Sequence, residues 1–307
     1  MAFSGPLANT MPASIRRYDL LHKRLERFTQ MLQGLEEGDV HALHQARVAS
    51  RRLREILPVL QVDPDVARRL GRRLRKVTQR LGAVRELDVL CLLIDELRQS
   101  GKYDAQALRR VATAASEDRA RARERLSDKL PSDELQRIVG KLNKIATGLK
   151  EGKSSRGWRW AVEARVTHRA SALKDALADA GALYLPARLH AVRIAVKKLR
   201  YAREVLVEAS GARTKSELQS LKRGQDILGR LHDMQMLLDR VRQLQASLTP
   251  PDITMWRKLD ALTTALENDC RRLHARFMRQ RNVVLTVCDK TTDGTKLSPA
   301  AARRAAS

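Results

Sequence analysis

The segment His44–Arg54, HQARVASRRLR, recurs in the second half of the chain as His190–Arg200, HAVRIAVKKLR. A second pair follows in the same order, with LGAVRELD at 81–88 and LGRLHDMQ at 228–235. The two pairs are offset by 146 and 147 residues. Two ordered matches at nearly the same offset predict an internal duplication, in which each half is a four-helix unit that buries its own apolar stripe.

The rest of the sequence is also typical of helices. Ala, Leu, Arg, Lys and Glu dominate, apolar residues recur every three or four positions, and Gly and Pro are sparse. The fold class predicted is therefore all-α, with long antiparallel helices. We expect helices at about 14–38, 39–61, 64–100, 102–129, 132–149, 157–180, 186–209, 214–247 and 252–284.

Breaks in the pattern predict the domain organisation. The stretch 151–155, EGKSS, has the composition of a linker. We expect a first four-helix bundle with a connecting helix at 14–150 and a second four-helix bundle at 151–285. Residues 286–307 are polar and rich in Ala, which predicts a disordered tail.

Composition narrows the choice of partners. Lys and Arg number 60 against 35 Asp and Glu, and the net charge of +25 favours a polyanionic partner because self-repulsion destabilises the compact state. Aromatic residues make up only 3%, which disfavours binding of single strands by base stacking. Three cysteines without metal-type spacing and the lack of an apolar leader or membrane span predict a cytoplasmic protein without membrane insertion.

The repeated segment has cationic and apolar residues on opposite faces of a helix. At about 100° per residue, Arg47, Arg51 and Arg54 lie within an arc of about 80° that includes His44. His190, Arg193, Lys197 and Arg200 share a face in the second copy, and neither copy contains an acid. A solvated face would normally mix charges of both signs, so we interpret these two faces as an anion-binding track. A solvated charged face is the alternative.

The helix expected from residue 64 extends this track. Arg69, Arg73, Lys76 and Arg80 flank its apolar stripe, whereas the second half offers Lys215, Lys222 and Arg223. Arg side chains can hold phosphate oxygens with both ends of a planar fork. Forks about 5.4 Å apart, one per turn, would grip a chain of phosphates without reading bases.

Other residues in the repeats are interpreted as structural. Gly82 and Gly229 lie inside helices, where Gly costs about 1 kcal/mol relative to Ala, and close helix packing is the favoured explanation. A polar cluster is expected at the end of the helix that contains Gly82, where acids orient neighbouring cations. It comprises Arg85, Glu86 and Asp88, with His232 and Asp233 opposite them in the second half.

The sequence predicts a binding module, not an enzyme. His41 and His44 have the spacing of metal ligands, but no partner carboxylate or cysteine accompanies them, so neither metal nor cofactor is predicted. A phosphate-binding Gly-rich loop and a nucleophile with an obvious base are both absent from the sequence.

The paired segments H-x-x-R-x-x-x-[RK]-[RK]-L-R and L-G-x-[VL]-[RH]-[ED] resemble the CHAD family, the conserved histidine α-helical domain, over about residues 14–285. The resemblance implies two four-helix bundles related by a pseudo-twofold axis. It also implies a basic channel between them that binds inorganic polyphosphate, in association with polyphosphate granules. Without the Glu-x-Glu-x-Lys signature of a triphosphate-tunnel domain, the chain resembles a stand-alone member.

The resemblance also implies which side chains line the channel. They are His44, Arg47, Arg51, Arg52, Arg54, Arg73 and Lys76 from the first half, and His190, Arg193, Lys197, Lys198, Arg200, Lys222 and Arg223 from the second. The main alternative is an architectural protein that binds nucleic acid without sequence specificity, because phosphate contacts alone would supply that affinity. A phosphate-processing enzyme is a third possibility. The sequence makes no prediction of oligomeric state.

Overall fold

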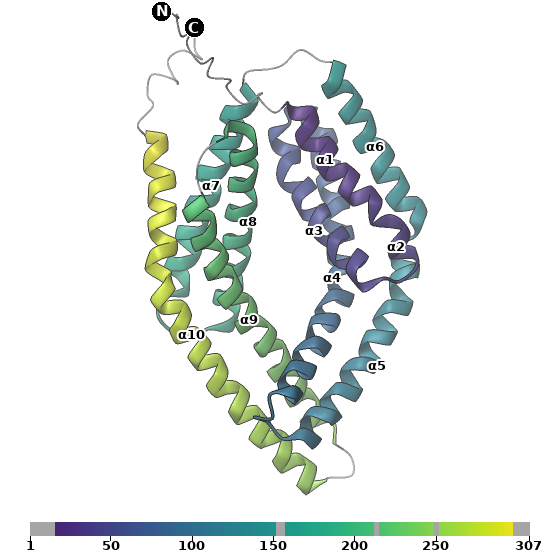
Figure 1. The fold of residues 1–307 in the computed structure, drawn as a ribbon, viewed down its shortest axis with the longest axis vertical. Helices are drawn as coiled ribbons and strands as arrows, with labels where there is room; N and C mark the ends of the chain where they lie inside the picture. The colour runs from purple at the N-terminus through teal and green to yellow at the C-terminus, as the bar shows by residue number, and fades with distance from the viewer. Residues whose placement is uncertain (1–15, 152–156, 212–214, 249–251, 297–307) are drawn as a thin grey trace, which may run out of the picture.

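The computed structural model describes residues 16–151, 157–211, 215–248 and 252–296, and every regular element in these ranges is a helix (Figure 1). The all-α fold class is therefore confirmed. The elements are α1 (Arg17–Gln30), α2 (Leu32–Glu36), α3 (Val40–Ile56), the 3-10 helix η1 (Leu57–Val59), α4 (Pro64–Gln99), α5 (Ala105–Lys129), α6 (Ser132–Glu151), α7 (Gly157–Ala180), α8 (Pro186–Ser210), α9 (Lys215–Ala246) and α10 (Ile253–Lys296).

The helices form two groups that converge at one end of the molecule (Figure 1). One hydrophobic cluster joins α1, α3, α6 and the first half of α4, and the other joins α9 and α10 to most of α7 and α8. The clusters also exchange segments. Leu90–Leu97 of α4 and Ala107–Ala115 of α5 pack in the second cluster, while Trp158 of α7 and Val205 of α8 pack in the first. Each cluster therefore draws on both halves of the chain, and the internal duplication and the boundary at residue 151 stay predictions.

Local signals position the helices that carry the repeated segments. The Asp39 side chain accepts hydrogen bonds from the backbone N–H groups of His41 and Ala42 at the start of α3. Asp63 caps α4 in the same way, and Pro64 follows at the first helical position. The predicted helix at 14–38 is split, because the chain turns at Met31 between α1 and α2. The predicted linker lies outside the described residues, apart from Glu151 at the end of α6.

The predicted tail at 286–307 is wrong in its first part, because α10 continues to Lys296. Val287 and Cys288 are buried in the second cluster, and Asp289 forms a 2.7 Å ion pair with Lys174 of α7. Thr291 accepts a hydrogen bond from Arg203 of α8. Tertiary contacts thus keep a polar segment helical, and the rest of the predicted tail, 297–307, lies outside the described residues.

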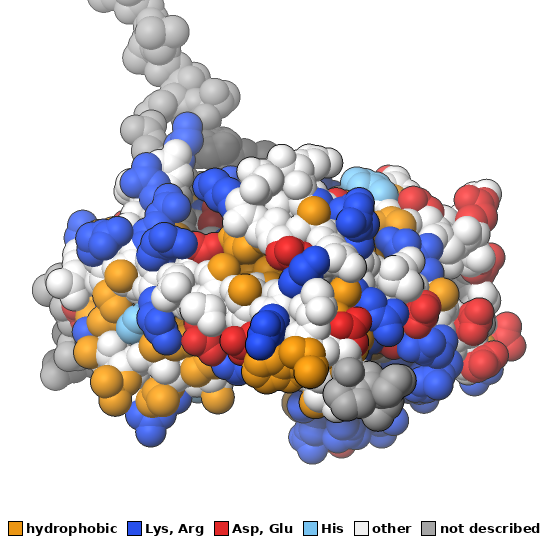
Figure 2. Space-filling view, turned by 90° about the horizontal axis from the view of Figure 1, so that it is seen from below, with side chains coloured by type: hydrophobic (Ala, Val, Ile, Leu, Met, Phe, Trp, Pro, Cys, Tyr) orange, Lys and Arg blue, Asp and Glu red, His pale blue; other side chains and the backbone are white. Residues whose placement is uncertain are grey.

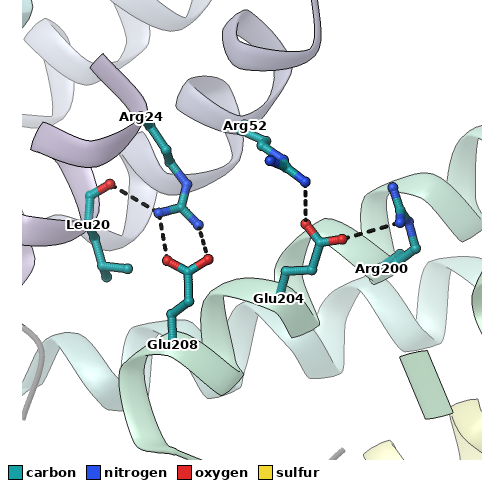
Figure 3. Close-up of polar contacts among 6 residues, drawn as sticks. All are labelled: Leu20, Arg24, Arg52, Arg200, Glu204 and Glu208. Carbon is teal, nitrogen blue, oxygen red and sulfur yellow. Dashed lines mark hydrogen bonds and ion pairs between the residues drawn. The ribbon is translucent and has the colours of Figure 1, made fainter. Parts of the chain in front are cut away.

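Two sets of ion pairs hold α8 against the first group of helices (Figure 3). The buried Arg24 of α1 donates to both carboxylate oxygens of Glu208, at 3.0 and 3.1 Å. Glu204, one turn earlier, pairs with Arg52 of α3 at 3.2 Å and with Arg200 of α8 at 3.3 Å. These contacts place the two repeated segments, on α3 and α8, beside each other.

Candidate functional site

A cavity of about 260 Å³ lies where α3, α4, α8 and α9 meet, and it is called the central pocket below. Both repeated segments line it. The predicted site residues that it brings together are His44, Arg47, Arg51, Arg193, Lys197 and Arg200. They come from the cationic faces of α3 and α8, which the helical periodicity placed opposite the apolar stripes.

The second pair of repeated segments supplies the other walls. Arg85 and Glu86 come from α4, and His232 and Asp233 come from α9. These residues lie in the middle of their helices, not at the end as predicted, because α4 and α9 extend to Gln99 and Ala246. The buried Asp88, expected in the same cluster, instead pairs with Arg123 of α5 at 3.2 Å.

The carboxylates of the pocket sit beside the arginines of the repeated segments. Arg47 Nη2 lies 3.9 Å from Glu86 Oε1, and Arg193 Nη2 lies 4.0 Å from Asp233 Oδ1. Such separations orient the guanidinium groups but leave their donors short of close hydrogen bonds to these acids. The pocket has six Lys or Arg side chains and two carboxylates, so positive charge is in excess.

Burial and this excess of positive charge shift the pKa values of the pocket residues. Burial, followed by the charges of Arg193 and Arg51, lowers the pKa of Lys197 to about 7. Burial, followed by the charge of Arg51, lowers the pKa of Arg47 to about 10. Burial also raises the pKa of Asp233, although Arg193 opposes that shift. A bound anion would relieve the repulsion among these cations.

The histidines of the pocket are held in the neutral form. Burial, then the charges of Arg85 and Arg47, lowers the pKa of His44, whose buried Nδ1 has no hydrogen-bond partner among the described residues. His190 does not line the central pocket. It lines a small adjoining cavity, which His232 also lines. The two Nδ1 atoms of His190 and His232 are 3.3 Å apart, so one neutral ring donates and the other accepts.

Gly82 makes room for one of the pocket cations. A Cβ atom at this position would lie 3.3 Å from Nε of Arg47, so a side chain here would press on the guanidinium group. At Gly229 a Cβ atom would meet nothing within 4 Å. The packing interpretation is therefore corrected: Gly82 admits an arginine side chain from α3, and Gly229 has no close neighbour.

Eight predicted residues lie outside the central pocket, and helix geometry explains the positions of two of them. Arg52 and Lys198 follow Arg51 and Lys197, so each points about 100° away around its helix. Arg52 pairs with Glu204, as Figure 3 shows. The charge of Lys198 faces a cluster around the buried Glu55, which pairs with Arg165 at 2.6 Å and with Arg169 at 3.2 Å.

The other displaced residues lie at several places. Arg54 is a charge neighbour of the Glu55 cluster and of Arg75. Arg73 and Lys76 line a different groove, between α4 and α6, because Arg73 precedes Arg85 by about 18 Å along α4. Lys222 and Arg223 are exposed on α9 and line neither cavity. The basic residues thus form a compact central pocket with separate basic clusters around it, and the single channel expected from the resemblance stays a prediction.

Arg85 and Tyr201 are among the lining residues that the site prediction left out. Arg85 had been assigned only an orienting role, yet it lines the pocket with the other cations. Tyr201 directly follows the second repeated segment, and the Arg200 guanidinium lies 5.2 Å from the centre of its ring. A tyrosine at the end of a basic helical segment carries no sequence signal that distinguishes it from a core residue.

Comparison with known proteins shows which family the chain belongs to and which solved structures share its fold. The family model of the CHAD domain matches residues 19–242, a range that contains all four repeated segments. The chain belongs to the CHAD domain family. The crystal structure of the CHAD domain from the plant Ricinus communis covers 92% of this chain and 95% of its own, with a TM-score of 0.60 and 20% sequence identity. PptA from Streptomyces chartreusis covers 90% of this chain and 97% of its own, with a TM-score of 0.57 and 20% identity. No curated protein matches the chain.

The outer surface of this CHAD chain differs in charge pattern from the pocket. On the face shown in Figure 2, Lys and Arg side chains are widespread and acidic side chains lie among them. None of the described helices is long and apolar enough to cross a membrane. Within the same described ranges, His, Cys, Asp and Glu form no group of three that would hold a metal ion.

Proposed function

We propose that this protein binds inorganic polyphosphate in the central pocket, as a binding module and not as an enzyme. The observation that carries the proposal is the convergence of six Lys or Arg side chains from four helices on one cavity with only two carboxylates. The lowered pKa of Lys197 supports it, because an unoccupied pocket disfavours its own charge. The family resemblance supplies polyphosphate as the expected ligand, and association with polyphosphate granules would follow from the same binding.

The size and lining of the pocket favour polyphosphate over nucleic acid. A cavity of about 260 Å³ is too small for a duplex, whose major groove alone is about 12 Å wide. A single strand would need aromatic platforms for its bases, and Tyr201 is the one aromatic ring of Phe, Tyr or Trp type in the lining. Polyphosphate has a charge on each repeating unit and no bases to place.

The pocket would hold the chain through its forked side chains. Arg47 and Arg51 are one turn apart on α3, and Arg193 faces them from α8, so successive phosphates would meet guanidinium groups from both sides. Glu86 and Asp233 keep two of these forks in position at about 4 Å without occupying their donors fully. A protonated Lys197 would add a fourth charge to the same chain.

A competition titration tests this proposal. Labelled long-chain polyphosphate is bound to the protein and challenged with duplex DNA at two salt concentrations. We expect DNA to displace polyphosphate only at a large excess of phosphate, at either salt concentration. Displacement phosphate for phosphate would instead support the nucleic-acid alternative, since phosphate contacts alone then set the affinity.

A matched pair of quadruple variants locates the binding. Replacing Arg47, Arg51, Arg193 and Lys197 by Ala is expected to weaken polyphosphate binding at least about 100-fold, because each charged hydrogen bond contributes about 1.5 kcal/mol or more. The control removes the same charge from exposed positions elsewhere, at Arg109, Arg110, Arg125 and Arg257. Circular dichroism and thermal melting report whether both variants fold. Equal losses in the two variants would contradict a dedicated pocket.

The proposal also predicts that the protein does not hydrolyse polyphosphate. Polyphosphate incubated with the protein and Mg²⁺ is expected to keep its length on a gel and to release no inorganic phosphate. Release that the quadruple pocket variant abolishes would show that the pocket is an active site.

A further inference from the structure

A second basic cavity lies on the other side of α4. This α4–α6 groove is lined by Val66, Arg69, Leu70, Arg72, Arg73, Lys76, Lys141, Lys144 and Ile145. Its volume is about 750 Å³, against about 260 Å³ for the central pocket. No residue lines both cavities, and Arg73 and Arg85 are about 18 Å apart along α4 and about 120° apart around it.

The groove exists because one side of the first helical group is open. In that group α1 packs against α3 and α6, and α3 packs against α4, but α4 and α6 meet only sparsely. Arg80 and Glu134 join them at one end through a 2.6 Å ion pair. In the second group the corresponding side is closed, because α10 packs along α7 as well as α9.

The lining of the groove is amphipathic. Its floor is apolar, with Leu70 fully buried and Val66 and Ile145 half-buried. Both rims are cationic, with exposed Arg69, Arg72 and Lys76 on α4 and exposed Lys141 and Lys144 on α6. No acid lines the groove, so these charges have no counter-charge within it.

We propose that the α4–α6 groove docks an acidic amphipathic helix of a partner protein. The apolar face of such a helix would cover Val66 and Ile145, and carboxylates on its two flanks would meet the cationic rims. The lining from Val66 to Lys76 extends about 15 Å along α4, which matches a docked helix of about ten residues. A bare polyanion would satisfy the rims but leave the floor exposed to water.

The chain's own ends do not have the chemistry to occupy the groove. Residues 1–15 contain no charged side chain, and residues 297–307 contain two Arg and no acid. Neither segment can neutralise a rim of Lys and Arg, and the second would add to the repulsion. Charge complementarity therefore favours an acidic partner protein over either of these two segments.

The test uses the full-length protein and a fluorescent synthetic peptide of about 14 residues, with Leu at positions i, i+3, i+4 and i+7 and Glu or Ala elsewhere. Two control peptides replace Leu by Ser, or Glu by Lys. We expect saturable binding of the Leu/Glu peptide in fluorescence anisotropy, and binding of each control at least tenfold weaker. Equal binding of the Ser control, or no binding of the Leu/Glu peptide, would overturn the proposal.

Protein variants separate the rim from the floor. The rim variant is Arg72→Ser with Lys144→Ser, and its control is Arg109→Ser with Arg110→Ser at exposed positions of α5. The floor is changed from either helix, by Val66→Ser or by Ile145→Ser, so that one variant remains if the other melts early. The rim variant and a folded floor variant are each expected to lose at least tenfold in peptide affinity, whereas the control changes less than about twofold.

Measuring polyphosphate binding by the same variants tests the docking proposal separately from the proposed function. The floor variants are expected to bind polyphosphate as the unchanged protein does, because neither side chain lines the central pocket. If polyphosphate displaces the peptide and the floor variants bind the peptide normally, the groove is a general polyanion surface and the docking proposal is wrong. The polyphosphate affinity of the quadruple pocket variant tests the proposed function, and its interpretation does not depend on the peptide results.

Discussion

Binding of polyphosphate should be coupled to uptake of a proton by Lys197. The Lys197 ammonium is buried among Arg193, Arg51 and Arg47, which lowers its pKa to about 7 in the free protein. A polyphosphate chain in the central pocket would surround the same ammonium with negative charge and raise its pKa. Binding therefore favours the protonated form, and the affinity should fall as the pH rises through 7.

The size of the effect follows from the pKa of the free protein. With a pKa of about 7, the fraction of Lys197 that lacks its proton is about 0.03 at pH 5.5, about 0.5 at pH 7 and about 0.97 at pH 8.5. If the bound ligand keeps Lys197 charged over this range, these fractions are the protons taken up per ligand bound. Above pH 8 the apparent affinity should then fall close to tenfold per pH unit.

Isothermal titration calorimetry in buffers of different ionisation enthalpy measures this uptake directly. Lys197→Arg is the matched control, because an arginine keeps its charge across the range and should bind without the pH-dependent uptake. Any uptake that remains in this variant at low pH reports the neutral histidines, His44, His190 and His232. Uptake that is the same at pH 5.5 and 8.5, or is unchanged in Lys197→Arg, would refute the reasoning.

Two further predictions concern helix contacts. Gly82→Ala should weaken polyphosphate binding several-fold, because its Cβ would press on the Arg47 guanidinium at 3.3 Å; Gly229→Ala, in open space, should leave binding unchanged and stabilise α9 by up to about 1 kcal/mol in urea unfolding. Glu208→Gln should lower the free energy of unfolding by about 2 kcal/mol, because it leaves the buried Arg24 without its carboxylate. Adding Arg24→Met to this variant should restore part of the loss. Unchanged stability of Glu208→Gln in urea unfolding would contradict this role.

Much of the fold could be predicted from local sequence. Asp39 and Asp63 cap the helices that carry the first repeated segments, and the helical periods of those segments separate cationic from apolar faces. The same periodicity predicted an anion-binding face on each of the two helices, and the resemblance implied that both faces line one channel. The structure brings Arg47, Arg51, Arg193 and Lys197 to one cavity. Capping and periodicity depend on neighbours within a few residues, so one sequence is enough to recognise them.

Other features depend on which helix packs against which. The resemblance assigned Arg52 and Lys198 to the same channel, but each points about 100° away from its neighbour in the pocket. Arg52 pairs with Glu204, and Lys198 lies near the charges of the Glu55 cluster. The end of α10 is polar in sequence and still helical, because contacts with α7 and α8 hold it.

The sequence by itself determined an all-α fold with a strongly basic pair of helices, because helix periodicity, caps and charge are local properties. Its repeated motifs also carried the resemblance to the CHAD family. Only the tertiary structure decided that six cations share one pocket, that Arg73 and Lys76 belong to a separate groove, and that Lys197 has a pKa of about 7. Those outcomes depend on burial and on charges brought together from distant parts of the chain, and neither is fixed until the helices pack.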